Sequence, residues 1–328
     1  MSDLTTAPGK RSGMKALLAS FPFIPALIIL IVLFALNGIF EPRSLSFRAV
    51  TGIFSTYLAL MLLAVAQTYV VFSGDIDLSA GAIVSLVNVV IIVLMERLGG
   101  GPGVVLLACF AGALVGAAAG LVNGIIVAGL RLQAIVATFA TSIFFTGLAL
   151  YVLPVAGTPA PEAYWLTYGG RFFGIPFVFF IVIAVAIIVG TLARTRLVTQ
   201  MLSVGDDAIA AFQSGLPVTL IRIKGYVLCG FFSALAALCV TGDTASGDPL
   251  VGGKMTLFSV AAVVLGGSAL SGGFGTVLGS IVGALIIGLI NSLVFFVGTP
   301  SEWQNLVQGL AILLALMAGI LVSRSARA

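Results

Sequence analysis

The sequence is a succession of long apolar runs, and this feature limits its fold more than any other. Ten runs approach or exceed the roughly 20 residues that a helix needs to cross the hydrocarbon core of a bilayer. We therefore predict an all-α, polytopic membrane protein of about ten transmembrane helices, at residues 21–40, 50–72, 78–95, 103–128, 131–153, 174–193, 222–242, 256–273, 275–297 and 303–323.

The composition supports lipid as the solvent of this chain. Charged residues make up 8% of its 328 residues, and hydrophobic residues make up 60%. An ordinary soluble domain carries roughly a quarter charged residues, so a water-soluble globule is excluded. The net charge of +4 lies mostly at the ends and in loops, which gives no support to nucleic-acid binding. Histidine is absent and the three cysteines lie in apolar runs, so we expect no metal site, no disulfide and no cofactor on this chain.

The distribution of Lys and Arg predicts the orientation in the membrane. With ten spans and the N-terminus inside, ten of these residues lie on the inner side and five on the outer side. We expect both termini in the cytoplasm, as tails over 1–20 and 324–328. Between them we expect one transmembrane domain over 21–323, with an inner loop at about 194–224.

Two features of the second half leave its organisation open. A short glycine-rich turn is all that separates the runs 256–273 and 275–297, which could instead be broken or re-entrant pieces. The tripeptide Ser-Gly-Asp occurs at 73–75 and again at 246–248, each time before an apolar run. The chain could therefore consist of two related halves, as many transporters do.

Glycines recur at every fourth position in two of the runs. In lipid, small residues at this spacing let two helix backbones approach closely. We interpret these glycines as helix-packing positions, with a gate or a subunit contact as the alternative. They are Gly112, Gly116, Gly120 and Gly124 in the fourth run, and Gly275, Gly279 and Gly283 in the ninth.

Two carboxylates lie between the second and third runs with almost no loop around them. They are Asp75 and Asp77, with Gly74 to make the turn and Ser79 to follow. An Asp or Ser here can cap the next helix through its free N–H groups. A role in gating or in a subunit contact is the alternative, and a cation site has little support from one short acidic cluster.

Neutral amides are prominent among the polar side chains inside the runs. Polar groups in a membrane are costly, so each is a candidate for function. Amides both donate and accept hydrogen bonds, which suits a neutral polyhydroxylated solute better than an ion. Contacts between helices are the alternative for each of the candidate solute-pathway residues, Gln67, Asn88, Asn123 and Asn291.

The inner loop contains a short helix signal. Asp206 or Asp207 can cap it, and Gly215 ends it. Ile209 and Phe212 share one face of this helix. Two helical turns are not stable alone in water, so the helix needs a groove on this chain or on a partner. No phosphate-binding G-x-x-x-x-G-K-[ST] motif occurs, so an ATPase would have to be another chain.

Three stretches resemble the motifs of one known family. Residues 73–81 read S-G-D-I-D-L-S-A-G, similar to the family's T-G-G-I-D-L-S-x-G. Residues 207–215, followed by Lys224 and Tyr226, look like its coupling segment, with two aspartates where the family usually has Asn-Pro-Glu. Residues 261–279 are similar to its A-A-V-V-I-G-G-x-x-L-x-G-G-x-G-x-x-x-G.

Over about residues 58–319 the chain thus resembles the permease subunits of ribose-type monosaccharide ABC importers, a branch that includes relatives for branched-chain amino acids and nucleosides. The resemblance implies a bacterial inner-membrane permease dimer, formed by two copies or with a related second chain. ATPase subunits would bind below it and use ATP, and a periplasmic binding protein would deliver solute from above. The permease itself would do no chemistry. The alternative is a secondary, ion-coupled transporter, whose coupling site would have to use Asp75 and Asp77.

Overall fold

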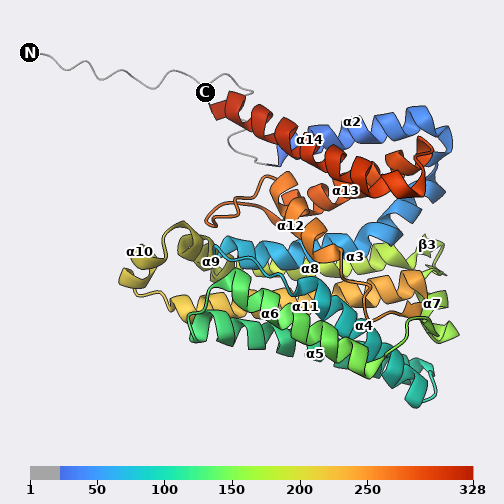
Figure 1. Cartoon of the computed structure of the whole chain (residues 1–328), viewed down its shortest axis with the longest axis horizontal. Coiled ribbons are helices and arrows are strands. Elements are labelled where there is room, and N and C mark those ends of the chain that lie inside the picture. The colour runs from blue at the N-terminus through green and yellow to red at the C-terminus, as the bar shows by residue number, and fades with distance from the viewer. Residues whose placement is uncertain (1–22, 328) are drawn as a thin grey trace, which may run out of the picture.

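The computed structural model describes residues 23–327, with side chains described up to residue 317. The predicted N-terminal tail 1–20 lies outside these residues, and positions 324–327 of the predicted C-terminal tail continue the last helix. Most helices lie side by side along the long axis, with α10 at one end of the molecule and α7 and β3 at the other (Figure 1). The predicted all-α, polytopic architecture is confirmed.

The described part of the chain consists of helices joined mostly by short connections. The helices are α2 (Ile24–Phe40), η1 (Pro42–Leu45), α3 (Phe47–Phe72), α4 (Ala80–Arg97), α5 (Pro102–Gly124), η2 (Ile125–Gly129), α6 (Ala134–Val152), α7 (Glu162–Tyr168), α8 (Phe177–Arg194), α9 (Arg196–Asp206), α10 (Ala208–Gln213), α11 (Val218–Thr244), α12 (Met255–Leu265), α13 (Val277–Phe296) and α14 (Ser301–Arg327). The strands are β1 (Thr158–Pro159), β2 (Arg171–Phe172), β3 (Ile175–Pro176) and β4 (Ser246–Gly247). They form two small antiparallel pairs, β1 with β4 and β2 with β3.

Every predicted run contains a helix, but not every helix qualifies as a span. Within the described residues, 7 helices are long and apolar enough to cross a membrane, and they are α3, α4, α5 with η2, α6, α8, α11 and α13. Helices α2 and α12 are apolar but shorter, with 17 and 11 residues. A multi-pass chain is therefore established, whereas the predicted number of ten spans is not.

The run predicted over 256–273 is wrong as a continuous span. Helix α12 ends at Leu265, so at 1.5 Å per residue its length is about 16 Å, half of a bilayer core. Gly267, Gly272 and Gly273 then adopt φ values of 86°, 88° and 73°, which favour glycine and stop the helix. The alternative of a broken piece is the one that the structure adopts.

Helix α11 is the central element of the packed interior. It contacts α3, α4 and α5 extensively, and α13 packs on α3 and α12 beside them. Residues 58–72 of α3 are buried without interruption. A helix that is apolar and buried on all sides belongs to the interior of a bundle, so α3 and α11 form the framework that positions the loops around them.

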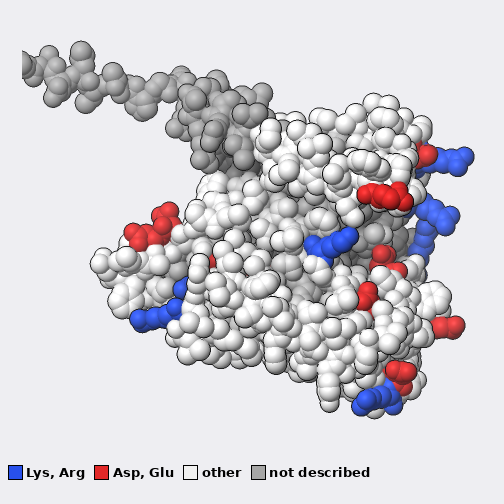
Figure 2. Space-filling model, in the orientation of Figure 1, with Lys and Arg blue, Asp and Glu red and all other residues white. Residues whose placement is uncertain are grey.

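The outer faces of several helices are apolar and exposed. Large exposed hydrophobic side chains lie on α5, α6, α8 and α14. Charged side chains gather mainly toward the two ends of the molecule, with broad uncharged surface between them (Figure 2). This distribution is the one expected for a protein whose middle is surrounded by lipid or by another apolar chain.

Candidate functional site

The predicted short helix of the inner loop is present at one end of the molecule. It is α10, which follows α9 directly (Figure 1). Of the two candidate caps, Asp207 is the one used, because its Oδ1 accepts from the N–H groups of Ile209 at 2.8 Å and Ala210 at 3.0 Å. Asp206 is instead the last residue of α9. Gly215 has a φ of 82° and turns the chain toward α11.

The tip of α10 presents two large apolar side chains to the outside. Ile209 and Phe212 are each 72% exposed, whereas Ala211 beside them is buried against the protein. The helix is thus anchored through its small residue and leaves its large ones free. The rest of the chain does not cover the Ile209 and Phe212 side chains. They therefore form an exposed apolar surface that a partner could bind.

Behind α9 and α10, three separate chain segments touch through glycine backbones. We call Gly74, Gly205, Gly272 and Gly273 the glycine junction. Gly205, near the end of α9, leaves no room for a Cβ because the Phe72 carbonyl and the glycines at 272 and 273 lie against it. Gly272 also lies against Gly74, and the N–H of Gly273 donates to the Phe72 carbonyl at 3.3 Å. The ends of α3 and α9 and the loop after α12 therefore meet at this point.

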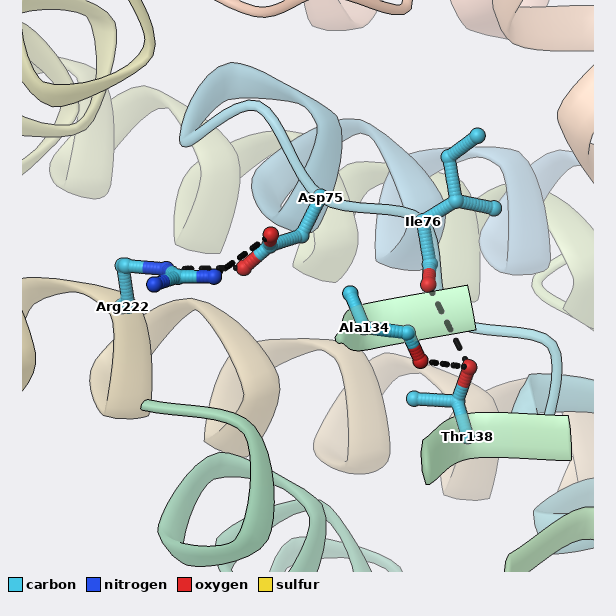
Figure 3. Close-up of polar contacts among 5 residues, drawn as sticks. All are labelled: Asp75, Ile76, Ala134, Thr138 and Arg222. Atoms are coloured by element: carbon cyan, nitrogen blue, oxygen red, sulfur yellow. Dashed lines mark hydrogen bonds and ion pairs between the residues drawn. The ribbon is translucent and has the colours of Figure 1, made fainter. Parts of the chain in front are cut away.

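An ion pair ties the same region to α11. The Arg222 guanidinium donates to both carboxylate oxygens of Asp75, with Nε at 2.9 Å and Nη2 at 2.7 Å (Figure 3). The Asp75 side chain is 8% exposed and that of Arg222 is 26% exposed. The Asp75 carboxylate is therefore engaged by Arg222, and the capping hypothesis, which named Asp77 or Ser79, depends on those two residues. Bidentate pairs of this kind are among the stronger polar contacts, and this one joins the 73–79 loop to the helix that follows α10.

Asp77, two positions further on, lies in a different environment. It is fully buried, and its Oδ1 accepts from the N–H of Ser79 at 2.8 Å and from the Ser79 hydroxyl at 2.7 Å. Ser79 is the N-cap residue of α4, but its side chain makes no capping hydrogen bond to the helix. Instead of a side-chain cap on the helix itself, Asp77 thus stabilises the turn immediately before α4.

Two of the predicted pathway amides belong to this same group. The Asn123 Nδ2 donates to the Ser79 hydroxyl at 2.6 Å and lies 3.3 Å from the Asp77 Oδ2. With its amide oriented to satisfy both atoms, Gln67 donates to the Asp77 carbonyl at 3.2 Å and accepts from its N–H at 3.0 Å. We call Gln67, Asp77, Ser79 and Asn123 the Asp77 network. All four are fully buried, so the network joins α3, α4 and α5 and favours the interhelical interpretation of both amides.

Sequence patterns did not single out Thr138, which fixes the other side of this loop. Its hydroxyl accepts from the Leu78 N–H at 3.0 Å. It also lies 2.8 Å from the Ala134 carbonyl and 3.3 Å from the Ile76 carbonyl (Figure 3). The residue sits one turn inside α6, and nothing in a local pattern distinguishes it from any other helical threonine.

The other two predicted pathway amides lie elsewhere. Asn88 of α4 donates to the Thr241 hydroxyl at 2.6 Å and to the Ser246 carbonyl at 3.2 Å, and it accepts from the Asp248 N–H at 2.7 Å. It therefore holds the second Ser-Gly-Asp tripeptide against α4 and α11. Asn291 lies on α13, beside Tyr57 of α3. The four amides do not line one common path within the described part of the chain.

Both glycine ladders lie where helix backbones touch. Gly116 and Gly120 face α11, where Gly230 faces them in return, and Gly112 faces the side chains of Val87 and Ile91 on α4. On α13, Gly279 lies against Gly266, and Gly283 lies against Ala262 of α12. Gly275 is an exception, because it lies in the loop before α13 and packs on Ser268. The remaining glycines have the geometry expected of packing positions.

Comparison with known proteins connects these features to a family. The family model described as "Branched-chain amino acid transport system / permease component" matches residues 49–316. The ribose import permease protein RbsC of Bacillus subtilis is 33% identical, over 90% of this chain and 91% of that protein. The autoinducer 2 import system permease protein LsrC of Yersinia enterocolitica is 32% identical, over 88% of this chain and 79% of its own.

A third relative, the L-arabinose ABC transporter permease protein AraH of Azospirillum brasilense, is 30% identical over 96% of this chain and 92% of that protein. No solved structure matches the chain. The family model covers most of the chain, and each of the three relatives matches it over at least 79% of its own length. With its apolar helices, the chain therefore belongs to the family of permease components of ABC import systems, multi-pass proteins of the inner membrane.

Proposed function

We propose that this permease moves a small, neutral, polyhydroxylated solute across the inner membrane by alternating access. A monosaccharide is the first candidate for this solute. The relatives named for ribose and L-arabinose support a sugar. The described interior supports a neutral solute, because its well-buried carboxylates, Asp75 and Asp77, are both engaged by protein groups. The chain serves as a transport subunit that binds no cofactor and performs no chemistry of its own.

The exposed apolar tip of α10 is the observation that carries the coupling part of this proposal. An ATPase subunit in the cytoplasm takes Ile209 and Phe212 into a groove, with Asp206, Asp207 and Gly215 fixing the shape of the segment. Movement of α9 and α10 reaches the interior through the glycine junction and through the Asp75–Arg222 pair. Gly74 and Asp75 thereby act in coupling, whereas Asp77 and Ser79 act as a fixed anchor.

The predicted orientation of the chain in the membrane also indicates where the other partners bind. With α10 in the cytoplasm and both termini on that side, the end that carries α7 and the β2–β3 pair faces the periplasm and receives the solute-binding protein. The exposed apolar faces of the outer helices are covered by lipid and by a second permease chain, either another copy or a paralogue.

A secondary transporter is the competing function, and the described carboxylates give it little support. An ion-coupled carrier usually binds its coupling ion at a buried acidic group. Asp75 is already neutralised by Arg222, and Asp77 already accepts hydrogen bonds from Ser79 and Asn123.

Reconstitution into liposomes with the cognate ATPase and binding protein separates the two functions. We expect uptake of D-ribose or L-arabinose that requires enclosed ATP and persists when ionophores remove every ion gradient. Uptake that follows an imposed gradient without ATP would contradict the proposal.

A further inference from the structure

A cavity of about 260 Å³ lies between α4, α6 and the start of α12. It differs from two other cavities of the described protein, whose walls are mainly apolar. Four hydroxyl groups, an aromatic ring and no charged side chain contribute to its wall. The hydroxyl groups are those of Ser85, Ser142, Thr146 and Thr256, and the ring is that of Phe139.

Two of these hydroxyl groups are already used by the protein. Ser85 accepts from the Gly252 N–H at 3.0 Å, and Thr256 accepts from the Gly81 N–H at 2.8 Å. Gly81 and Gly252 touch each other so closely that neither has room for a Cβ. These contacts hold the start of α4 against the loop before α12 and form a rigid wall on one side of the cavity.

The other two hydroxyl groups have no hydrogen-bond partner among the described residues. Ser142 and Thr146 are half-buried and lie one turn apart on α6. A helical Ser or Thr commonly bonds back to a carbonyl one turn earlier, and the other two threonines of α6 do make such bonds. Thr138 donates to the Ala134 carbonyl and Thr141 to the Thr138 carbonyl. The cavity is therefore lined by two α6 hydroxyl groups that are free to donate and accept hydrogen bonds.

Phe139 completes the same face of α6. Residues 139, 142 and 146 follow the helical spacing of three and four, so the ring and the two hydroxyl groups form one stripe along the cavity. The Phe139 side chain is 57% exposed, so its ring is open to an occupant. An apolar ring beside uncharged hydroxyl groups matches a molecule that has both C–H faces and O–H groups.

The position of the cavity also fits a transport path. Helix α12 begins at Met255, beside the start of α4, and it is too short to cross a bilayer. Transporters often hold their solute where such discontinuous helices end inside the protein. The starts of α4 and α12 lie beside this cavity, which Gly253, Thr256 and Leu257 help to line.

We propose that this cavity is a transit site for a neutral polyhydroxylated solute. Ser142 and Thr146 exchange hydrogen bonds with solute hydroxyl groups, and Phe139 packs against an apolar face of the solute. The absence of charged groups from the wall discriminates against ions. This inference rests on the proposed function and names residues of this chain that contact the solute.

Thiol labelling tests the cavity without depending on transport. Ser142→Cys and Thr146→Cys are treated in membranes with 2-hydroxyethyl methanethiosulfonate. Thr141→Cys on the same helix is the matched control, since Thr141 is partly buried like the other two but does not line the cavity. We expect both cavity cysteines to react at least about tenfold faster than the control, because the reagent needs water to reach a thiolate. Equal reactivity at all three positions would overturn the site, whatever the protein transports.

Uptake tests the contacts themselves in the reconstituted transporter. The double variant Ser142→Ala/Thr146→Val removes both hydroxyl groups with little change of shape, and Thr141→Val is its control. Loss of two neutral hydrogen bonds predicts an uptake of D-ribose or L-arabinose about tenfold lower, at unchanged ATPase activity and membrane abundance. The control stays within about twofold of the parent. Parental uptake in the double variant would overturn the contacts, whereas a parent that imports neither sugar would instead contradict the proposed function.

Discussion

Asp75 and Asp77 stand two positions apart in one loop, yet they belong to regions with opposite properties. Asp75 pairs with a partly exposed Arg222 and lies beside the glycine junction that meets α9. Asp77 is fully buried and is held by neutral groups of α3, of α5 and of Ser79, the N-cap residue of α4. The first region connects to the exposed α10, and the second connects only to the interior.

This contrast suggests different roles for the two ends of the 73–79 loop in coupling. In the proposed coupling, a movement of α9 and α10 would act on the Asp75 end of the loop through the glycine junction, and the Asp77 end would resist it. Satisfied polar networks in a low-dielectric interior are rigid, because breaking one bond leaves its partner unsatisfied. Variants in the Asp77 network should therefore damage folding, whereas variants near Asp75 and α10 should damage coupling in a folded chain. The predictions below are ordered by their expected effect on the stability of the fold, from largest to smallest.

Gly116→Leu should have the largest effect on folding. A side chain at this position meets the backbone of α11 at Gly230, so two helices of the interior must separate. We expect a severe loss of folded protein, measured as monodisperse chain recovered from membranes in mild detergent. Gly147→Leu on α6, where no atom lies near the added Cβ, is the control. Normal abundance with an altered choice of solute would show that this helix face belongs to the pathway.

Asp77→Ala should rank second. It leaves the N–H and hydroxyl of Ser79 without their acceptor in a buried site, at a cost of about 2–4 kcal/mol. This exceeds the roughly 1 kcal/mol expected of a simple helix cap. Asp77→Asn keeps one acceptor but turns an amide N–H₂ toward Asn123, so its cost should be intermediate. Thermal unfolding in detergent ranks the parent and the two variants by stability. An Asp77→Ala variant as stable as the parent would contradict the role of Asp77 as a fixed anchor.

Arg222→Lys should cost less, because the pair with Asp75 is partly exposed. Lysine keeps the charge but cannot reproduce the two parallel hydrogen bonds, and we expect a loss of about 1 kcal/mol. A double-mutant cycle with Asp75→Asn and Arg222→Gln measures the coupling energy of the pair. Transport should fall more than stability does, because the pair joins the loop to α11. A coupling energy of zero would mean that the ion pair does not link the 73–79 loop to α11 energetically.

Much of the architecture can be read from local patterns. The apolar runs predict the helices, and the glycine spacing predicts where helices pack most closely. Asp207 and Gly215 predict where α10 begins and ends. Each of these is a property of a short window of sequence, governed by hydropathy, backbone freedom or capping.

The errors all concern contacts between distant segments or breaks inside apolar sequence. Arg222 lies 147 positions from Asp75, so no window contains the pair. The residues after Leu265 read G-G-S-A-L-S-G-G, and their hydropathy alone does not show that the glycines at 267, 272 and 273 adopt left-handed φ values and stop α12. Gln67 and Asn123 are amides in apolar runs, and only the fold reveals that Asp77 lies between them.

Phe212→Glu should have the smallest effect on folding, and it tests the central claim most directly. The side chain is exposed at the tip of α10, so the variant should reach the membrane at parental abundance. If α10 docks in an ATPase groove, removing a central apolar anchor should cost at least about 2 kcal/mol, or roughly 30-fold in affinity. We expect the ATPase to be lost from the purified complex and uptake to vanish, while Ser214→Glu, on the same short segment, keeps both. Retention of the ATPase and parental uptake in Phe212→Glu would contradict the account.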